Sequence, residues 1–225
     1  IWRNKKLKHN QFKALFKNDQ AMTVVVSIIL VYTSLNICGN LVLYFFRFDV
    51  GNEGAYSIFA AVAFAAQVLV MMVIPLLRKR FSKSQLFISG FIIQIAGFAV
   101  ILIMAFAKLY TPQSWYILCL PGILIYLGYG MLNVIMTIFL SDSVDYGEVM
   151  NGTREESVIF SMQTFTIKLA SGIAVFLAGL VVDWINLDTA AAVQTQDTLD
   201  ALRMWMTFPS VILLIVGIFV FKRFY

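Results

Sequence analysis

Runs of apolar residues, each close to twenty residues long, recur along this chain and are separated by short polar segments. About twenty consecutive apolar residues suffice for a helix to cross a ~30 Å hydrocarbon layer. The pattern therefore predicts an all-α, polytopic membrane protein with a six-helix bundle over residues 21–225, preceded by a basic, amphipathic segment over residues 1–20. The expected spans are residues 21–46, 55–77, 85–107, 115–140, 157–182 and 203–221.

Composition and charge agree with this class. Hydrophobic residues make up 60% of the chain and charged residues 13%, whereas about a quarter of the residues in a soluble domain are charged. Six spans place thirteen of the seventeen lysines and arginines on one side and only Arg47, Lys108 and Arg203 on the other. Because positive residues gather in cytoplasmic segments, we expect both ends of the chain in the cytoplasm of a multi-pass cell-membrane protein. The lipid bilayer is the expected surrounding, and nucleic acid is not an expected partner.

One lysine stands inside an apolar span. Lys168 lies eleven residues into the span 157–182, which is about 16 Å from the start of a helix rising ~1.5 Å per residue. A lysine near the bilayer centre costs about 2.5–3.5 kcal/mol on insertion scales. No acidic residue of this chain lies at the same expected depth, so the ammonium would need a wet cavity, a substrate or a segment outside this chain. The alternative is a structural lysine satisfied by helix carbonyls.

Other polar side chains accompany these apolar runs. Thr164 lies one turn from Lys168 on the same face, with Gln163 beside it, a set that suits a hydroxyl-rich ligand. In the first span, four polar residues recur at every fourth position and share one helix face: Tyr32, Asn36, Asn40 and Tyr44. This face either lines a cavity or makes hydrogen bonds to other helices.

An acidic segment follows the fourth span. We expect residues 141–156 to form a polar loop, with Asp142 and Asp145 three residues apart at a helix end and a tight turn at Asn151–Gly152. Arg154 is expected to reach the carboxylates or nearby helix ends. The segment is either a solvated turn or a latch that holds helices together and releases them during a conformational cycle. Neither a nucleophile with a base nor metal-ligand spacing is visible, so we expect no enzyme activity, metal site or cofactor.

The run DSVDYGEVMNGTREES, which begins at Asp142, and the run IKLASG around Lys168 carry a resemblance to a known family. Together they resemble the glycoside–pentoside–hexuronide:cation symporter family, the melibiose-carrier group of the major facilitator superfamily. The basic run FKALFKNDQ, residues 12–20, is similar to the central cytoplasmic loop of that family. The resemblance implies that this chain is the second half of a twelve-helix carrier, helices seven to twelve, whose other half is missing here. Such a carrier would move a sugar together with a cation by alternating access.

The resemblance also implies roles for single residues. Lys168, Thr164 and Gln163 would lie in or near the sugar and cation pocket, and Asn133 stands where melibiose carriers have a sugar-facing tryptophan. The residues that match the cytoplasmic gating motif are Asp142, Asp145, Tyr146, Gly147, Arg154 and Glu156. The coupling cation (Na⁺, H⁺ or Li⁺) would bind mainly in the absent half.

Two other functions remain open. A relative on the same scaffold could carry a lipid-like or drug-like substrate, in which case a greasy groove should open toward lipid. If sugars are carried, Asn36, Asn40, Thr164 and Lys168 should instead face a common space. The second alternative is a membrane domain that serves assembly or sensing and transports nothing.

Overall fold

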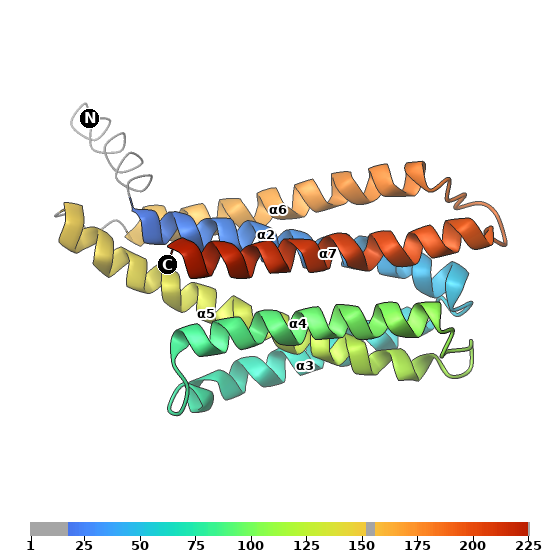
Figure 1. Ribbon diagram of the computed structural model, residues 1–225, viewed down its shortest axis with the longest axis horizontal. Coiled ribbons are helices and arrows are strands. Elements are labelled where there is room, and N and C mark those ends of the chain that lie inside the picture. The colour runs from blue at the N-terminus through green and yellow to red at the C-terminus, as the bar shows by residue number, and fades with distance from the viewer. Residues whose placement is uncertain (1–17, 152–155, 225) are drawn as a thin grey trace.

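The computed structural model describes residues 18–151 and 156–224, and these residues form helices and no strands. Figure 1 shows the six main helices, which are α2 (Asp19–Tyr44), α3 (Ala55–Leu77), α4 (Lys83–Phe106), α5 (Cys119–Asn151), α6 (Glu156–Trp184) and α7 (Gln196–Phe224). A π-helical turn, η1 (Phe45–Asp49), extends α2, and a 3₁₀ turn, η2 (Trp115–Leu118), precedes α5. All six helices are long and apolar enough to cross a membrane. The predicted all-α, six-span architecture is confirmed.

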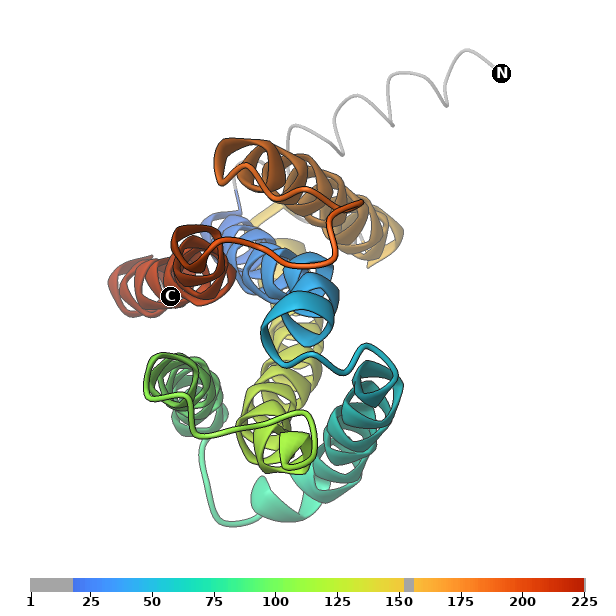
Figure 2. The ribbon, with the colours of Figure 1, turned by 90° about the vertical axis from the view of Figure 1, so that its right-hand side faces the viewer.

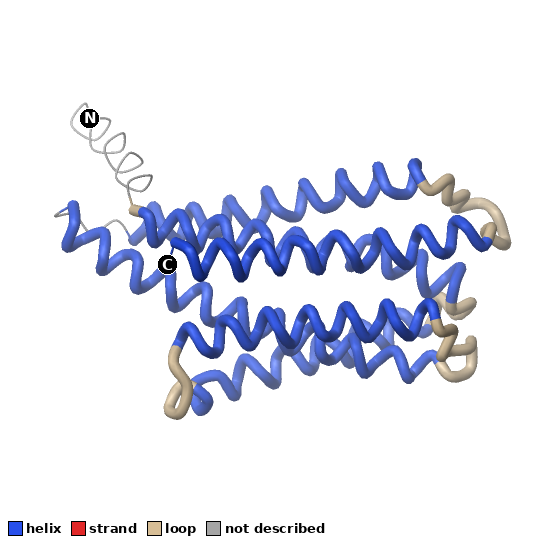
Figure 3. Tube along the Cα trace, viewed as in Figure 1, coloured by secondary structure: helices blue, strands red, loops and turns tan. Residues whose placement is uncertain are grey.

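The connections lie at the two ends of the bundle (Figure 3). The terminal end carries the described beginning of α2, the described end of α7 and residues 78–82. The far end carries residues 50–54, 107–114 and 185–195. The basic segment expected over residues 1–20 lies outside the described residues, except for its last three.

Helices α2 and α5 form the middle of the bundle, as the end-on view in Figure 2 shows. On one side α7 packs on α2, α4 packs on α5, and α4 and α7 also touch each other. On the other side α6 packs on α2 and α3 packs on α5. No close packing joins α3 to α6 in the described part of the chain, so these two helices flank a face that is left without a cover.

The helix ends differ from the expected spans by more than four residues in two places. The predicted polar loop over residues 141–156 is wrong in its first part, because α5 continues without a break through Asn151. The Asp142 carboxylate accepts from Lys83 of α4, and the Ser143 carbonyl accepts from Asn18, so contacts with other helices hold α5 beyond the apolar run. Helix α7 begins at Gln196 instead of 203 because the hydroxyl of Thr195 accepts from the backbone N–H of Thr198.

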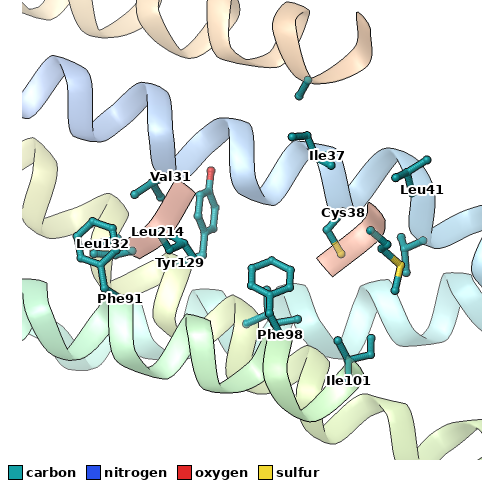
Figure 4. Close-up of a cluster of buried hydrophobic side chains, with 14 of the residues drawn as sticks. Val31, Ile37, Cys38, Leu41, Phe91, Phe98, Ile101, Tyr129, Leu132 and Leu214 are labelled. Atoms are coloured by element: carbon teal, nitrogen blue, oxygen red, sulfur yellow. The ribbon is translucent and has the colours of Figure 1, made fainter. Parts of the chain in front are cut away.

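Close backbone contact joins α4 to α5. A Cβ atom on Gly128 would lie 2.6 Å from both the backbone nitrogen of Gln94 and the carbonyl oxygen of Gly90, so only glycine fits there. Apolar side chains from α2, α4, α5 and α7 fill the space around this contact, among them Phe91 and Leu132, as the close-up in Figure 4 shows. Small interface residues of this kind let membrane helices pack without a hydrophobic driving force.

A buried ion pair closes the far end. Arg203 on α7 donates from Nε to Oδ2 of Asp49 at 2.9 Å and from Nη2 to Oδ1 at 2.5 Å, and both side chains are only 3% exposed. Arg203 also donates from Nη1 to Asp200 at 2.6 Å. The hydroxyl of Tyr110 donates to Asp49 as well, and burial followed by this hydrogen bond raises the Tyr110 pKa, so the proton stays in place. The network joins α2, α7 and the connection between α4 and α5.

Replacing Arg203 with Gln should lower the free energy of unfolding by about 3–5 kcal/mol, because it leaves the Asp49 carboxylate buried without its counter-charge. The measurement is thermal or denaturant unfolding of the detergent-solubilised protein. Arg47→Gln is the matched control, since Arg47 pairs with Glu53 at 3.7 Å and the two side chains are 43% and 58% exposed. It should cost less than about 1 kcal/mol. Equal losses in the two variants would contradict the assignment.

Candidate functional site

Lys168 lies about midway along α6, twelve residues after its first residue, Glu156, in a helix of 29 residues. At ~1.5 Å per residue this is about 18 Å from the start of a helix about 43 Å long. The Lys168 side chain is exposed, and it makes no hydrogen bond or ion pair with any residue that the structure describes. The described part of the bundle therefore carries a lysine at mid-height without supplying its partner.

Helix α6 turns different faces to its neighbours. Its buried stripe is made of small residues, chiefly Ala170, Ala174 and Ala178, which pack on α2. Lys168 and Thr164 lie together on an exposed face. Gln163 lies about 140° around the helix from Lys168 at 100° per residue.

The Gln163 amide donates to the hydroxyl of Thr137 on α5 at 3.3 Å. Thr164 donates to the carbonyl of Phe160 within α6 at 3.2 Å. The structure thus keeps Thr164 beside Lys168, whereas Gln163 connects α6 to α5.

The polar face of α2 serves both purposes considered for it. At its middle, the Asn133 amide of α5 donates to the hydroxyl of Tyr32 at 2.6 Å, which is a hydrogen bond between helices. Asn36 and Asn40 instead donate within α2, to the carbonyls of Tyr32 and Asn36, each at 2.7 Å. Toward the far end, Asn40 and Tyr44 line a cavity of about 350 Å³ between α2 and α6.

The α6 wall of this cavity continues the face that carries Lys168. The residues of α6 that line it are Val175, Ala178, Gly179, Val182 and Asp183. Lys168, Val175, Gly179 and Val182 are spaced by seven, four and three residues, the spacing of a single helix stripe. A Cβ atom on Gly172 or Gly179 would meet nothing within 4 Å, so the stripe borders open space beyond the lysine.

The described residues that match the gating motif lie at the terminal end. Asp142 on α5 pairs with Lys83 at the start of α4, with oxygen–nitrogen distances of 2.5 and 2.7 Å. Asn18, the N-cap of α2, accepts from the backbone N–H of Ala21 and donates to the carbonyl of Ser143, both at 2.9 Å. A Cβ atom on Gly147 would lie 3.0 Å from the Asn18 amide nitrogen, so glycine permits the approach.

The other members of the motif lie close by in the sequence. Asp145 and Tyr146 are exposed on the extended part of α5, and Glu156 occupies the first turn of α6, where a carboxylate suits the helix dipole. Arg154 lies outside the described residues. Within those residues, no three His, Cys, Asp or Glu side chains gather as metal ligands would.

Comparison with known proteins decides the family. Residues 3–225 match the sequence pattern of the family described as MFS/sugar transport protein. The chain belongs to that sugar-transport family of the major facilitator superfamily. The resemblance to glycoside–pentoside–hexuronide symporters is thereby confirmed, and the six apolar helices belong to a multi-pass membrane protein.

Three curated proteins similar to this chain are named as a carrier, a symporter and a transporter. The chain is 26% identical to the raffinose carrier protein of Pediococcus pentosaceus over 92% of this chain and 32% of that protein. It is 25% identical to the uncharacterized symporter YjmB of Bacillus subtilis, covering 95% of this chain and 45% of that one. It is 27% identical to the isoprimeverose transporter of Lactiplantibacillus pentosus, covering 75% and 34%. The chain thus spans between a third and a half of the length of these relatives.

Three features of the site were not predicted from the sequence: two contacts between helices and one residue of the cavity wall. Lys83 pairs with Asp142, and the expected spans place both residues at the same membrane edge, which is the one sequence signal for this contact. The bond between Tyr32 and Asn133 joins residues 101 positions apart, and nothing in either span points to the other. Asp183 follows directly on the expected span 157–182, and its place in the cavity wall depends on the packing of α6 against α2.

A double-mutant cycle tests whether the Tyr32–Asn133 bond holds α2 to α5. Tyr32→Phe and Asn133→Leu should show a coupling energy of about 0.6 kcal/mol and at most about 1.7, the range for hydrogen bonds between membrane helices. The measurement is the unfolding free energy of the two single variants and the double variant. Asn40→Leu combined with Asn133→Leu is the control and should be additive, because Asn40 bonds within its own helix. Additivity in both cycles would rule out the bond.

Proposed function

We propose that this chain is the C-terminal half of a cation-coupled sugar symporter that works by alternating access in the cell membrane. Family membership and the names of its relatives support sugar as the substrate class. The share of those relatives that the chain spans supports the assignment to one half. Both ends of the chain would then lie in the cytoplasm, as the distribution of basic residues favours.

The observation that carries the proposal is the exposed, unpaired Lys168 halfway along α6. A charge at that depth is costly unless it meets a partner or water. An ammonium has three donors and no acceptor, so it would bind sugar hydroxyls or a carboxylate of the other half. Thr164 on the same face adds a hydroxyl one turn away.

The uncovered face between α3 and α6 is where the other half would lie. Two bundles that face each other across a central cavity can rock to open it to either side in turn. The coupling cation (Na⁺, H⁺ or Li⁺) would bind mainly in that other half, with Lys168 communicating with its site. Asn36 and Asn40 line the same side of α2 and favour sugars over a lipid-like or drug-like substrate.

Lys168→Ala in the full-length carrier should reduce cation-driven uptake of radiolabelled sugar into vesicles by about 10- to 100-fold, as expected for loss of one hydrogen bond to a charged group. Raffinose and lactose serve as the first sugars. Lys222→Ala, which removes one lysine at the end of α7, is the control and should leave uptake at the wild-type level. Immunoblotting of the vesicles corrects for expression. Wild-type uptake and cation dependence in Lys168→Ala would remove the basis of the proposal.

The pair Lys83–Asp142 is proposed to act as a latch on the terminal side, as the resemblance to the gating motif implies. Each side chain is about one third exposed, at 34% and 36%, so the pair is accessible enough to open and close. Lys83→Asp should slow uptake through repulsion with Asp142, and the double variant Lys83→Asp with Asp142→Lys should restore most of it. The control is Arg80→Asp, which makes the same charge change in the adjacent exposed loop. Failure of the double variant to recover any uptake would contradict a latch that depends on the ion pair.

A further inference from the structure

The cavity between α2 and α6 lies well away from Lys168. Its α6 wall runs from Val175 to Asp183, which is seven to fifteen residues beyond Lys168, or about 10–22 Å at ~1.5 Å per residue. Its volume of about 350 Å³ is at the lower end of the range for small-ligand pockets. A space of this size suits one sugar ring better than a whole oligosaccharide.

The polar groups of this cavity keep unused hydrogen-bonding capacity. Within the described part of the chain, the Tyr44 hydroxyl and the Asp183 carboxylate make no hydrogen bond or ion pair. Asn40 donates from its amide nitrogen to the carbonyl of Asn36, and its amide oxygen accepts no hydrogen bond from the described residues. The ring of Tyr44 is stacked on that of Phe48 at 6.5 Å between centroids, with 10° between the planes, and is thereby held in place.

These groups match the surface of a neutral sugar. A carboxylate accepts from two hydroxyls, a tyrosine hydroxyl donates and accepts, and an amide oxygen accepts. The rest of the α6 wall, formed by Val175, Ala178 and Val182, is apolar and suits the C–H face of a pyranose. A metal cation is a poor match, since hard cations take six or more oxygen ligands and the cavity holds a single carboxylate.

The charge of the far end argues against an anionic sugar. Asp183 is the only charged residue that lines the cavity. Around it, the segments 47–54, 107–114 and 183–203 together carry six acidic and three basic residues. A glucuronate or another acidic sugar would therefore meet like charge at this point, although Lys168 deeper in the carrier would attract it.

We infer that Asn40, Tyr44 and Asp183 form a second sugar subsite toward the far end of the bundle, which binds one ring of a neutral glycoside and disfavours acidic sugars. The inference rests on the proposed function, because it assigns the substrate class of the same transport path. It adds a subsite that is separate from the one at Lys168. The carboxylate of Asp183 sets the preference for an uncharged ring.

The test uses the intact, detergent-solubilised carrier and isothermal titration calorimetry with raffinose, lactose and glucuronate. Asp183→Asn should weaken binding of the neutral sugars and strengthen that of glucuronate. The ratio of their dissociation constants should change by about fivefold or more, since two unit charges ~4 Å apart change a binding constant by about that factor even in water. Gly179→Leu should weaken neutral-sugar binding by filling the cavity, and its side chain starts in open space, so the fold is spared.

Asp197→Asn is the matched control. Asp197 is exposed at the same end of the bundle, in the first turn of α7, and does not line the cavity. The subsite would be overturned if Asp183→Asn left the ratio of the dissociation constants for neutral sugars and glucuronate unchanged. It would also be overturned if Asp197→Asn changed that ratio equally, or if Asp183→Asn affected Na⁺ binding alone. A wild-type preference for glucuronate would also overturn it while leaving sugar transport intact. If the wild-type carrier neither binds nor takes up any of these sugars, the proposed function itself fails.

Discussion

Charged groups inside an apolar helix bundle must find a partner or meet water, and this constraint sorts the polar residues of the chain. Arg203 shows one solution, because two carboxylates satisfy its guanidinium and the pair with Asp49 is almost wholly buried. Lys168 shows the other, since its ammonium projects from the middle of α6 without a partner in the described part of the chain. A paired charge holds helices together, whereas an unpaired one marks a surface that another component has to meet.

The paired groups are not spread evenly over the helices. The Asp49–Arg203 network fixes α2 to α7 at the far end, and the Asn18–Ser143 bond together with the Lys83–Asp142 pair fixes α2 and α4 to α5 at the terminal end. Helix α6 takes part in none of these contacts. Its alanine stripe packs on α2, and Gln163 donates to Thr137 of α5. Small side chains thus hold the helix with the candidate ligand-binding lysine closely against α2.

Hydropathy was enough to predict the helices and the mid-helix position of Lys168, because both depend only on distance along the chain. It could not place the end of α5, where contacts with Asn18 and Lys83 hold the helix outside the apolar run. Gln163 was also expected beside Lys168. A separation of five residues in a helix instead directs the two side chains to different faces. Hydropathy could not predict the network around Asp49 and Arg203 for another reason. Asp49 and Arg203 lie 154 positions apart, so only the packing of α2 against α7 brings them together.

Lys168 and Asp183 on α6, which make no ion pair with the residues that the structure describes, are opposite in sign and lie fifteen residues apart at the two ends of one stretch of exposed helix surface. An anion would be attracted at the first and repelled at the second, and a cation would experience the reverse. A neutral polyol is favoured at both, because its hydroxyls accept from an ammonium and donate to a carboxylate with equal ease. If the chain carries sugars as proposed, opposite charges in series would favour a ligand that makes hydrogen bonds but has no net charge. The small residues between them, Gly172 and Gly179, keep that surface open.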